Sequence, residues 1–150
     1  FRKWQFSLGA VAAVFHDVLI VLSIFSVFYG ILPFSLEIDQ AFIAAILTII
    51  GYSLNDTVVV FDRIREHLGS FKKKEMNTLV NDALNSTLSR TINTSLTTFF
   101  VLLVIFLFGG EVIRGFMFAL MVGVLVGTYS SLFVASPIML DTLKKVEEKK

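Results

Sequence analysis

The sequence predicts an all-α integral membrane protein, a polytopic bundle of four transmembrane helices. Hydrophobic residues make up 55% of the 150-residue chain, and Phe alone occurs 16 times. Three long runs carry no charged residue, at 18–36, 91–110 and 115–140. Each run reaches or approaches the roughly 20 residues that cross the hydrocarbon layer of a bilayer. A soluble domain would interrupt such runs with charges at helical spacing, so the composition is typical of a membrane protein.

Breaks in the apolar pattern set the limits of the predicted spans. Pro33 follows the first span, and Gly109 with Gly110 follows the third, at positions where helices commonly end. Pro137 lies near the end of the fourth span, where a kink is tolerated. We therefore predict spans at 7–31, 40–61, 91–108 and 115–140.

The segment between the second and third spans has a helical pattern of its own. Its apolar residues recur at intervals of three and four, which is typical of an amphipathic helix. We predict a helix at 75–89 on the cytoplasmic membrane surface that runs into the third span; the alternative is an ordinary solvated connector. The apolar positions are Met76, Leu79, Val80, Ala83, Leu84 and Leu88.

The distribution of Lys and Arg predicts the orientation of the chain. Eleven of the 13 basic residues lie before the first span, between the second and third spans, or after the fourth. Cytoplasmic segments carry such an excess of positive charge. Both ends of the chain and its central loop are therefore predicted to be cytoplasmic. Arg114 is the one basic residue in the opposite loops, and Arg90 lies at a membrane edge.

Asp56 is the single charged residue within the predicted second span. A carboxylate at that depth costs a few kcal/mol, so it is a candidate functional group by default. Burial raises the pKa of a carboxyl group, and a nearby cation lowers it. A carboxyl group between these two effects can bind and release a proton near neutral pH. Polar residues that can surround it or line a water path are Tyr52, Ser53, Asn55 and Thr57.

Arg90 is the candidate cation, because it lies at the cytoplasmic start of the third span. It can act as an intramembrane partner of Asp56, or it can extend to phosphate headgroups as arginines at helix ends do. The polar residues that continue from it into the span favour the partner role. These are Asn93, Thr94, Thr97 and Thr98.

His16 and Asp17 form a polar pair in the first span, about 15 Å inside by helical rise. They can act as a proton relay or as a static interhelical hydrogen bond, and both interpretations stay open.

Small residues at intervals of four predict close helix packing in the fourth span. The row comprises Gly123, Gly127 and Ser131, and Gly51 is assigned the same role in the second span. The sequence predicts no metal site, no cofactor and no enzymatic activity, since it has no Cys and no ligand or nucleophile pattern. The basic stretch 72–74 favours anionic lipid over nucleic acid.

Several stretches resemble the SecF family, one half of the SecD/SecF protein-export membrane complex. The most specific is 51–66, which reads Gly-Tyr-Ser-Leu-Asn-Asp-Thr-Val-Val-Val-Phe-Asp-Arg-Ile-Arg-Glu. The others are 15–18, 88–95, and 108–110 followed by 123–135, so the resemblance covers essentially the whole chain in order. The family has six membrane helices with a periplasmic domain between the first two, and this chain resembles the last four.

The resemblance implies a bundle of the resistance-nodulation-division type in the bacterial cytoplasmic (inner) membrane, surrounded by membrane lipid. It implies pairing with SecD, as a separate subunit or as the SecD half of a fused chain, next to the Sec translocon channel and the exported preprotein. It also implies use of the proton-motive force, with protons as the coupling ion and Asp56 and Arg90 involved in their transport. His16 and Asp17 match a further family feature.

Two alternatives stay open at this point. The first is an exporter of small molecules or lipids from the same superfamily, which also needs an intramembrane carboxylate. The second is a non-transporting scaffold in which Asp56 and Arg90 only clamp two helices together.

Overall fold

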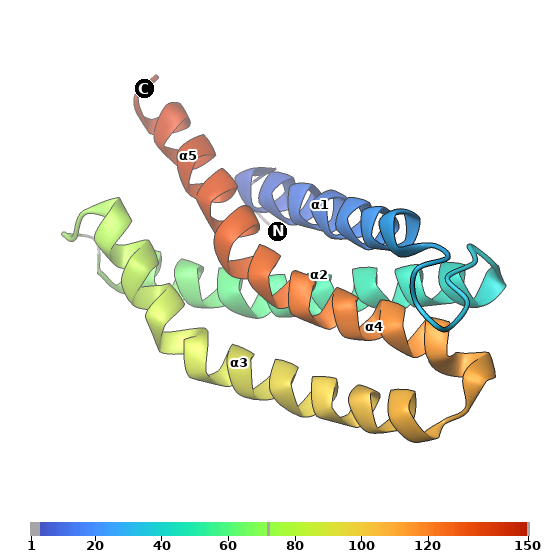
Figure 1. The fold of residues 1–150 in the computed structure, drawn as a ribbon. Coiled ribbons are helices and arrows are strands. Elements are labelled where there is room, and N and C mark those ends of the chain that lie inside the picture. The colour runs from blue at the N-terminus through green and yellow to red at the C-terminus, as the bar shows by residue number, and fades with distance from the viewer. Residues whose placement is uncertain (1–3, 72, 150) are drawn as a thin grey trace.

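The structure is a computed structural model that describes residues 4–71 and 73–149. Within these ranges the regular structure is helical throughout, as the sequence predicts. The bundle places α2 and α4 between α1 on one side and α3 on the other (Figure 1). The elements are α1 (Trp4–Phe28), α2 (Gln40–Ser70), α3 (Met76–Phe108), α4 (Glu111–Ser130), the π-helical segment η1 (Ser131–Ala135) and α5 (Ser136–Glu147).

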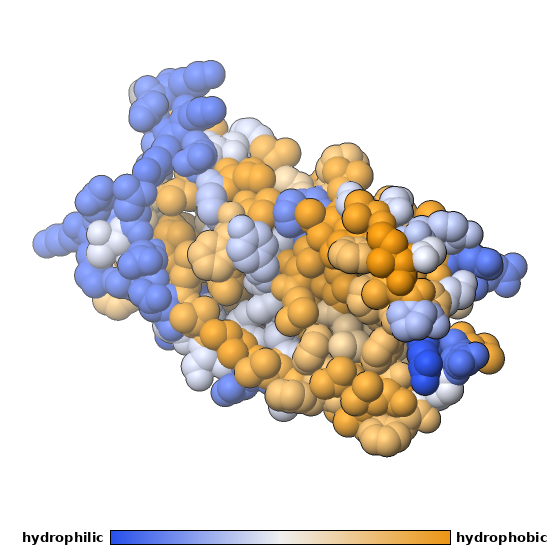
Figure 2. All heavy atoms as spheres, in the orientation of Figure 1, coloured by the Kyte–Doolittle hydropathy of each residue, from blue (hydrophilic) through white to orange (hydrophobic). Residues whose placement is uncertain are grey.

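Four helical segments are long and apolar enough to cross a membrane, which confirms the predicted fold class. They are Trp4–Phe28, Gln40–Ser70, Met76–Phe108 and Glu111–Glu147, the last of which joins α4, η1 and α5. Figure 2 shows a broad hydrophobic middle flanked by hydrophilic residues at both ends of the bundle. One hydrophilic end carries the α2–α3 connection and the C-terminal end of α5. Arg2, Lys3, Lys72 and Lys150, which the predicted orientation also uses, lie outside the described residues.

The helices do not end where the apolar runs end. The first helix stops at Phe28, before its predicted limit at 31, because Gly30 adopts a φ of +76° that leaves the helical region. In contrast, α2 continues to Ser70, well beyond the predicted limit at 61. Its last two turns are rich in charged residues that favour a helix but not hydrocarbon. The fourth span likewise extends from 111 to 147 rather than from 115 to 140.

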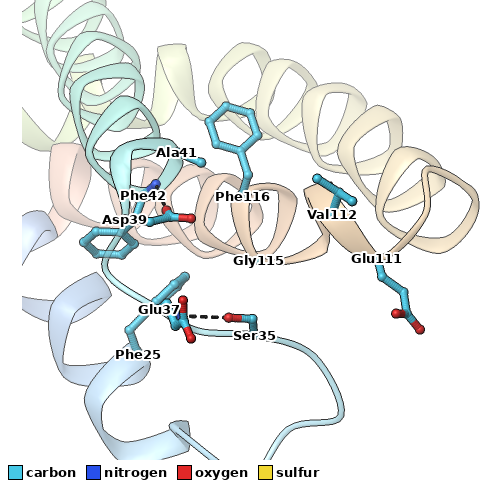
Figure 3. Close-up of a pocket in the computed structure, with 10 residues that line it drawn as sticks. All are labelled: Phe25, Ser35, Glu37, Asp39, Ala41, Phe42, Glu111, Val112, Gly115 and Phe116. Carbon is cyan, nitrogen blue, oxygen red and sulfur yellow. Dashed lines mark hydrogen bonds between the residues drawn. The ribbon is translucent and has the colours of Figure 1, made fainter.

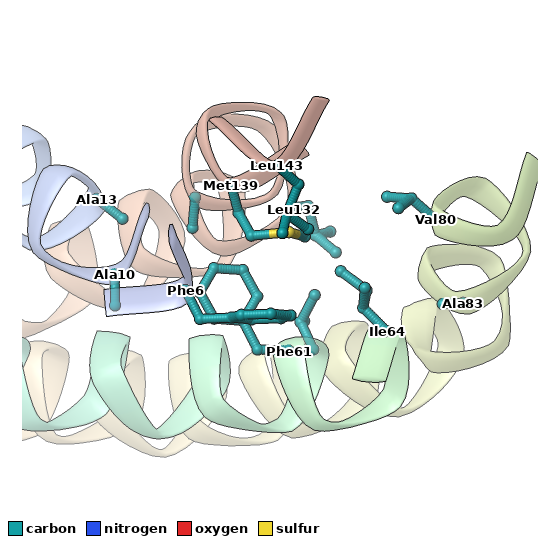
Figure 4. Packing of buried hydrophobic residues seen from close by; sticks show 12 residues of the cluster. Phe6, Ala10, Ala13, Phe61, Ile64, Val80, Ala83, Leu132, Met139 and Leu143 are labelled. Atoms are coloured by element: carbon teal, nitrogen blue, oxygen red, sulfur yellow. The ribbon is translucent and has the colours of Figure 1, made fainter. Parts of the chain in front are cut away.

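The amphipathic segment at 75–89 is helical and runs into the third span, as the sequence analysis predicts. It forms the first half of α3 and continues without a break into the third span. Leu79, Val80 and Ala83 are buried, so this half of α3 covers the bundle instead of only lying on a membrane surface. Figure 4 shows Val80 and Ala83 opposite Ile64 of α2 and Leu143 of α5.

Two hydrophobic clusters hold the bundle together near its two ends. The cluster in Figure 4 joins α1, α2, α3, η1 and α5, and the edge-to-face rings of Phe6 and Phe61 lie within it with centroids 5.2 Å apart. The other cluster joins α1, α2 and α4 and includes Phe25 and Phe42. The polar residues described below lie between these two clusters along the helices.

Candidate functional site

Asp56 is buried between α2 and η1, with 9% of the residue exposed. The Ser131 hydroxyl of η1 donates a hydrogen bond of 3.1 Å to Asp56 Oδ2. Among the described residues this is the one hydrogen bond that the carboxylate accepts. A carboxylate offers about four acceptor positions, so most of this capacity stays available to a mobile partner.

Arg90 lies on α3 and is exposed on the surface of the bundle. Its charge is near enough to act electrostatically on Asp56. The ion pairs of the described residues do not include one between Arg90 and Asp56. The two residues are therefore electrostatic neighbours without a direct salt bridge, and Arg90 does not hold the Asp56 carboxylate in place.

Asp17 of α1 is almost completely buried, at 1% exposure. Its Oδ2 accepts hydrogen bonds from the Ser53 hydroxyl of α2 at 2.5 Å and the Ser130 hydroxyl of α4 at 2.8 Å. On Oδ1, the ring nitrogen Nδ1 of His16 lies at 3.1 Å. This carboxylate thus joins three helices, and these contacts resemble a static interhelical clamp more than a relay.

A chain of hydroxyl groups connects α2, α3 and α4. Thr128 donates to the backbone oxygen of Val124 at 2.8 Å, which leaves its oxygen to accept a hydrogen bond from Ser95. Ser95 in turn accepts from the Tyr52 hydroxyl at 3.1 Å. Each hydroxyl donates one proton, so the chain runs in a single direction from Tyr52 to Val124.

The π-helical segment has an identifiable cause. Pro137 lacks a backbone N–H, and in a regular helix its ring would clash with the carbonyl oxygen of Phe133. Widening of the helix over Ser131–Ala135 accommodates it. The Ser136 hydroxyl donates to the backbone oxygen of Ser131 at 3.0 Å and completes the turn. Figure 1 shows α5 leaving the direction of α4 at this point.

The predicted polar stripe on α3 faces outward. Asn93 and Thr94 are exposed, and the Thr94 hydroxyl donates to the backbone oxygen of Arg90 at 2.9 Å. The polar residues that face the other helices are Thr91 and Ser95 instead. On α2, Asn55 is exposed as well, and among the described residues the side-chain hydrogen bond of Asp56 is with Ser131 and not with Asn55 or Asn93.

Two buried hydroxyl groups have no hydrogen-bond partner among the described residues. They belong to Thr57, which follows Asp56, and to Thr91, which follows Arg90. Each threonine is 1% exposed. Buried polar groups of this kind usually bind water or another polar group.

The small residues of α4 lie directly on α2. A Cβ added at Gly123 would overlap the side chain of Ile49, and one added at Gly127 would lie 3.3 Å from Ser53 Cβ. Gly51 differs, because an added Cβ would meet no atom within 4 Å. Within this chain Gly51 therefore does not bring two helices together. The predicted packing residue Ser131 has a further contact that the spacing did not suggest, its hydrogen bond to Asp56.

Ser95, Thr128 and Ser130 are site residues that the sequence analysis did not single out. Ser130 and Thr128 belong to the polar run 128–131 inside an otherwise apolar span, which is the signal that could have identified them. Ser95 lies in the stretch 88–95 that resembles the SecF family, but the sequence alone does not show which face of the helix it occupies.

A small pocket lies at the opposite end of the bundle from the α2–α3 connection (Figure 3). Glu37, Asp39 and Glu111 contribute its acidic side chains, but the Asp39 carboxylate is engaged in capping α2 through the backbone N–H of Phe42 at 2.9 Å. In the described part of the chain no group of three or more His, Cys, Asp or Glu could hold a metal ion.

Comparison with known proteins identifies close relatives of this chain. Residues 1–145 match the family model described as protein export membrane protein SecD/SecF, C-terminal. The protein translocase subunit SecF of Rhodothermus marinus is 65% identical over 139 residues, which cover 93% of this chain and 45% of that protein. SecF of Cereibacter sphaeroides is 49% identical over 138 residues, covering 92% and 41%. The chain thus spans less than half the length of these relatives.

Two solved structures have the same fold. One is SecDF in its super-membrane-facing form, with a TM-score of 0.84, 42% identity, and coverage of 98% of this chain and 19% of that one. The other is SecDF from Thermus thermophilus, a translocon-associated membrane protein, with a TM-score of 0.83, 44% identity, and coverage of 95% and 19%.

Proposed function

Since this chain belongs to the SecD/SecF family of protein export membrane proteins, we propose that it forms part of a SecF-type subunit that uses the proton-motive force to assist Sec-dependent export. In this proposal the subunit lies in the bacterial cytoplasmic membrane, with both ends of the described chain in the cytoplasm. Its partners are SecD, the Sec translocon channel and the exported preprotein. Protons are the coupling ion.

The observation that carries the proposal is the contrast between the two buried carboxylates. Asp17 accepts hydrogen bonds from Ser53 and Ser130 and also contacts the His16 ring nitrogen, whereas Asp56 accepts one hydrogen bond, from Ser131. A carboxylate that exchanges protons needs an unoccupied oxygen and access to a proton carrier. Among the described residues only Ser131 donates a hydrogen bond to the Asp56 carboxylate. The hydroxyls of Thr57 and Thr91, which have no hydrogen-bond partner among those residues, are polar groups that can bind water.

Arg90 compensates the charge of Asp56 without blocking it. A direct ion pair would hold the carboxylate ionised, and a buried pair is costly to break. An exposed cation within electrostatic range acts on the charge of the carboxylate without occupying either of its oxygens. When Asp56 binds a proton, the attraction between α2 and α3 weakens, and we propose that their packing then shifts. This arrangement gives less support to a scaffold clamped by these two residues.

Replacement of Asp56 by Asn in the full-length protein with its partner subunit tests the proposal. Export into membrane vesicles, measured with and without a proton gradient, should lose its dependence on the gradient while the complex still assembles. The matched control is Asp62→Asn, the same chemical change six residues further along α2 at an exposed position. Gradient-dependent export in Asp56→Asn at the native rate would overturn the proposal.

A further inference from the structure

Ser131 has two hydrogen-bond acceptors for one proton. Its hydroxyl oxygen lies 3.1 Å from Asp56 Oδ2 and 2.9 Å from the backbone oxygen of Thr128. A hydroxyl group donates one proton and accepts through two lone pairs. Ser131 can therefore donate to Asp56 or to Thr128, but not fully to both at once.

The charge of Asp56 decides between these two arrangements. An ionised carboxylate only accepts hydrogen bonds, so it takes the Ser131 proton. A neutral carboxyl group carries an O–H that needs an acceptor, and the Ser131 oxygen is the side-chain oxygen in contact with it. Ser131 then turns its own proton to the backbone oxygen of Thr128, and every group stays satisfied.

We propose that Ser131 is a positioning residue that reverses the direction of its hydrogen bond to Asp56 whenever this carboxyl group gains or loses a proton. The inference rests on the proposed role of Asp56 as the proton-binding group, and it adds the regulation of that site. The contact between α2 and η1 then persists in both protonation states. The packing change that accompanies proton binding is consequently confined to the side of α2 that faces Arg90.

The π-helical segment makes this arrangement specific to Ser131. Because Ser136 holds the backbone oxygen of Ser131, the wide turn is fixed where the hydroxyl meets Asp56. The preceding residue, Ser130, has the same chemistry, with its hydroxyl 2.8 Å from Asp17 Oδ2 and 3.1 Å from the backbone oxygen of Gly127. Ser130 serves the other carboxylate and is therefore a matched control.

Few other titratable groups surround Asp56. On the side of α3 there is Arg90, and on its own helix Tyr52, whose hydroxyl donates to Ser95. α1 contributes Asp17 and His16, whose side chains are hydrogen-bonded to each other. On α4, Tyr129 is exposed, and its ring centroid lies 6.4 Å from that of His16. Glu111 and Arg114 lie at the other end of α4.

Difference infrared spectroscopy of the full-length protein in lipid tests the inference. The Asp56 carboxyl band is identified by its loss in Asp56→Asn, and it is followed through a pH titration in Ser131→Ala, Ser131→Thr and Ser130→Ala. In Ser131→Ala the carbonyl stretch of the neutral carboxyl group should move to higher wavenumber, because its hydrogen-bond partner is gone. The titration midpoint should move by less than about one pH unit, because both charge states lose a partner.

The alternatives give different results. A donor that served only the ionised form would move the midpoint by about one to two pH units in Ser131→Ala, and this would overturn the inference. An unchanged band in Ser131→Ala, or an equal change in Ser130→Ala, would overturn it as well. Ser131→Thr keeps the hydroxyl and should resemble the native protein. If no titrating band depends on Asp56 at all, the proposed function itself fails, which is a separate outcome.

Discussion

The Ser53 hydroxyl of α2 donates a 2.5 Å hydrogen bond to the Asp17 carboxylate of α1, at the level where the two helices meet α4. The same Asp17 oxygen also accepts from Ser130. One buried carboxylate thus fixes three helices, while the other buried carboxylate, Asp56, keeps most of its acceptor capacity free. This difference fits the proposed function, in which Asp17 is structural and Asp56 is the proton-binding group.

Asp17→Asn should destabilise the bundle without removing the titration of Asp56. The amide is uncharged and has one acceptor oxygen in place of two. Its hydrogen bonds from Ser53 and Ser130 are therefore weaker than those to the carboxylate, since hydrogen bonds to charged groups contribute about 1.5–3 kcal/mol each. We expect a lower temperature of thermal unfolding for the full-length protein in detergent, and a smaller decrease for Ser53→Ala. An unchanged unfolding temperature in both variants would contradict the clamp.

Gly123→Ala should weaken the packing of α4 on α2. The added methyl group overlaps Ile49, and overpacking of this kind costs about 1–3 kcal/mol. Gly69→Ala is the control, since an added Cβ at Gly69 on α2 meets nothing within 4 Å. Thermal unfolding should separate the two variants, and equal unfolding temperatures would show that Ile49 moves aside without cost.

Pro137→Ala should let η1 relax toward a regular α-helix and change the direction of α5. The substitution restores a backbone N–H and removes the clash that the wide turn accommodates. Because the chain has no Cys, spin labels can be attached at Thr78→Cys on α3 and Glu147→Cys on α5. Their distance distribution, measured by double electron–electron resonance, should differ between the proline and alanine forms. Superimposable distributions would mean that the proline does not cause the π-helical turn.

Arg90→Gln should change the titration of Asp56 more than Arg90→Lys. Lysine keeps the positive charge and glutamine removes it, while both keep a long polar side chain. An electrostatic partner without a direct contact depends on charge rather than on guanidinium geometry. Infrared titration of the Asp56 carboxyl band checks this. Equal effects of the two substitutions would indicate that a specific guanidinium contact forms in another state of the protein.

The predicted orientation is testable by labelling. Ser70 is the last residue of α2 and Ile38 lies two residues before its first, and both positions are exposed, so each can carry a single cysteine. In right-side-out vesicles a membrane-impermeant maleimide should modify the cysteine at position 38 and not the one at position 70, and inverted vesicles should reverse the result. Modification of the cysteine at position 70 from the outside would contradict the positive-inside assignment.

The sequence predicted the number and type of the spans because uncharged runs and their flanking charges are strong signals. The helix ends were harder to predict. The apolar run of the second span stops at Phe61, but the residues after it still favour a helix, and α2 continues to Ser70. The predicted helix at 75–89 does run into the third span and forms the first half of α3.

For the site, a charge within an apolar run was sufficient to find Asp56 and Asp17. Their partners could not be predicted, because adjacent polar residues on α3 face different ways: Ser95 points inward and Thr94 outward. Only the rotation of each helix about its axis decides this, and it is set by packing. The π-helical turn also changes the direction in which the following side chains point, relative to a regular helix of 3.6 residues per turn. For this reason the regular spacing assigned Ser131 to helix packing alone.

The lengths of α2 and α3 have a mechanical consequence. With 31 and 33 residues, these helices are about 46 and 50 Å long at 1.5 Å per residue, and the hydrocarbon layer is about 30 Å thick. Both continue beyond Asp56 and Arg90, and there the cluster around Ile64 packs them against α1, η1 and α5. A change in the packing of α2 and α3 near Asp56 and Arg90 would therefore be passed through this cluster to α1 and α5 as well.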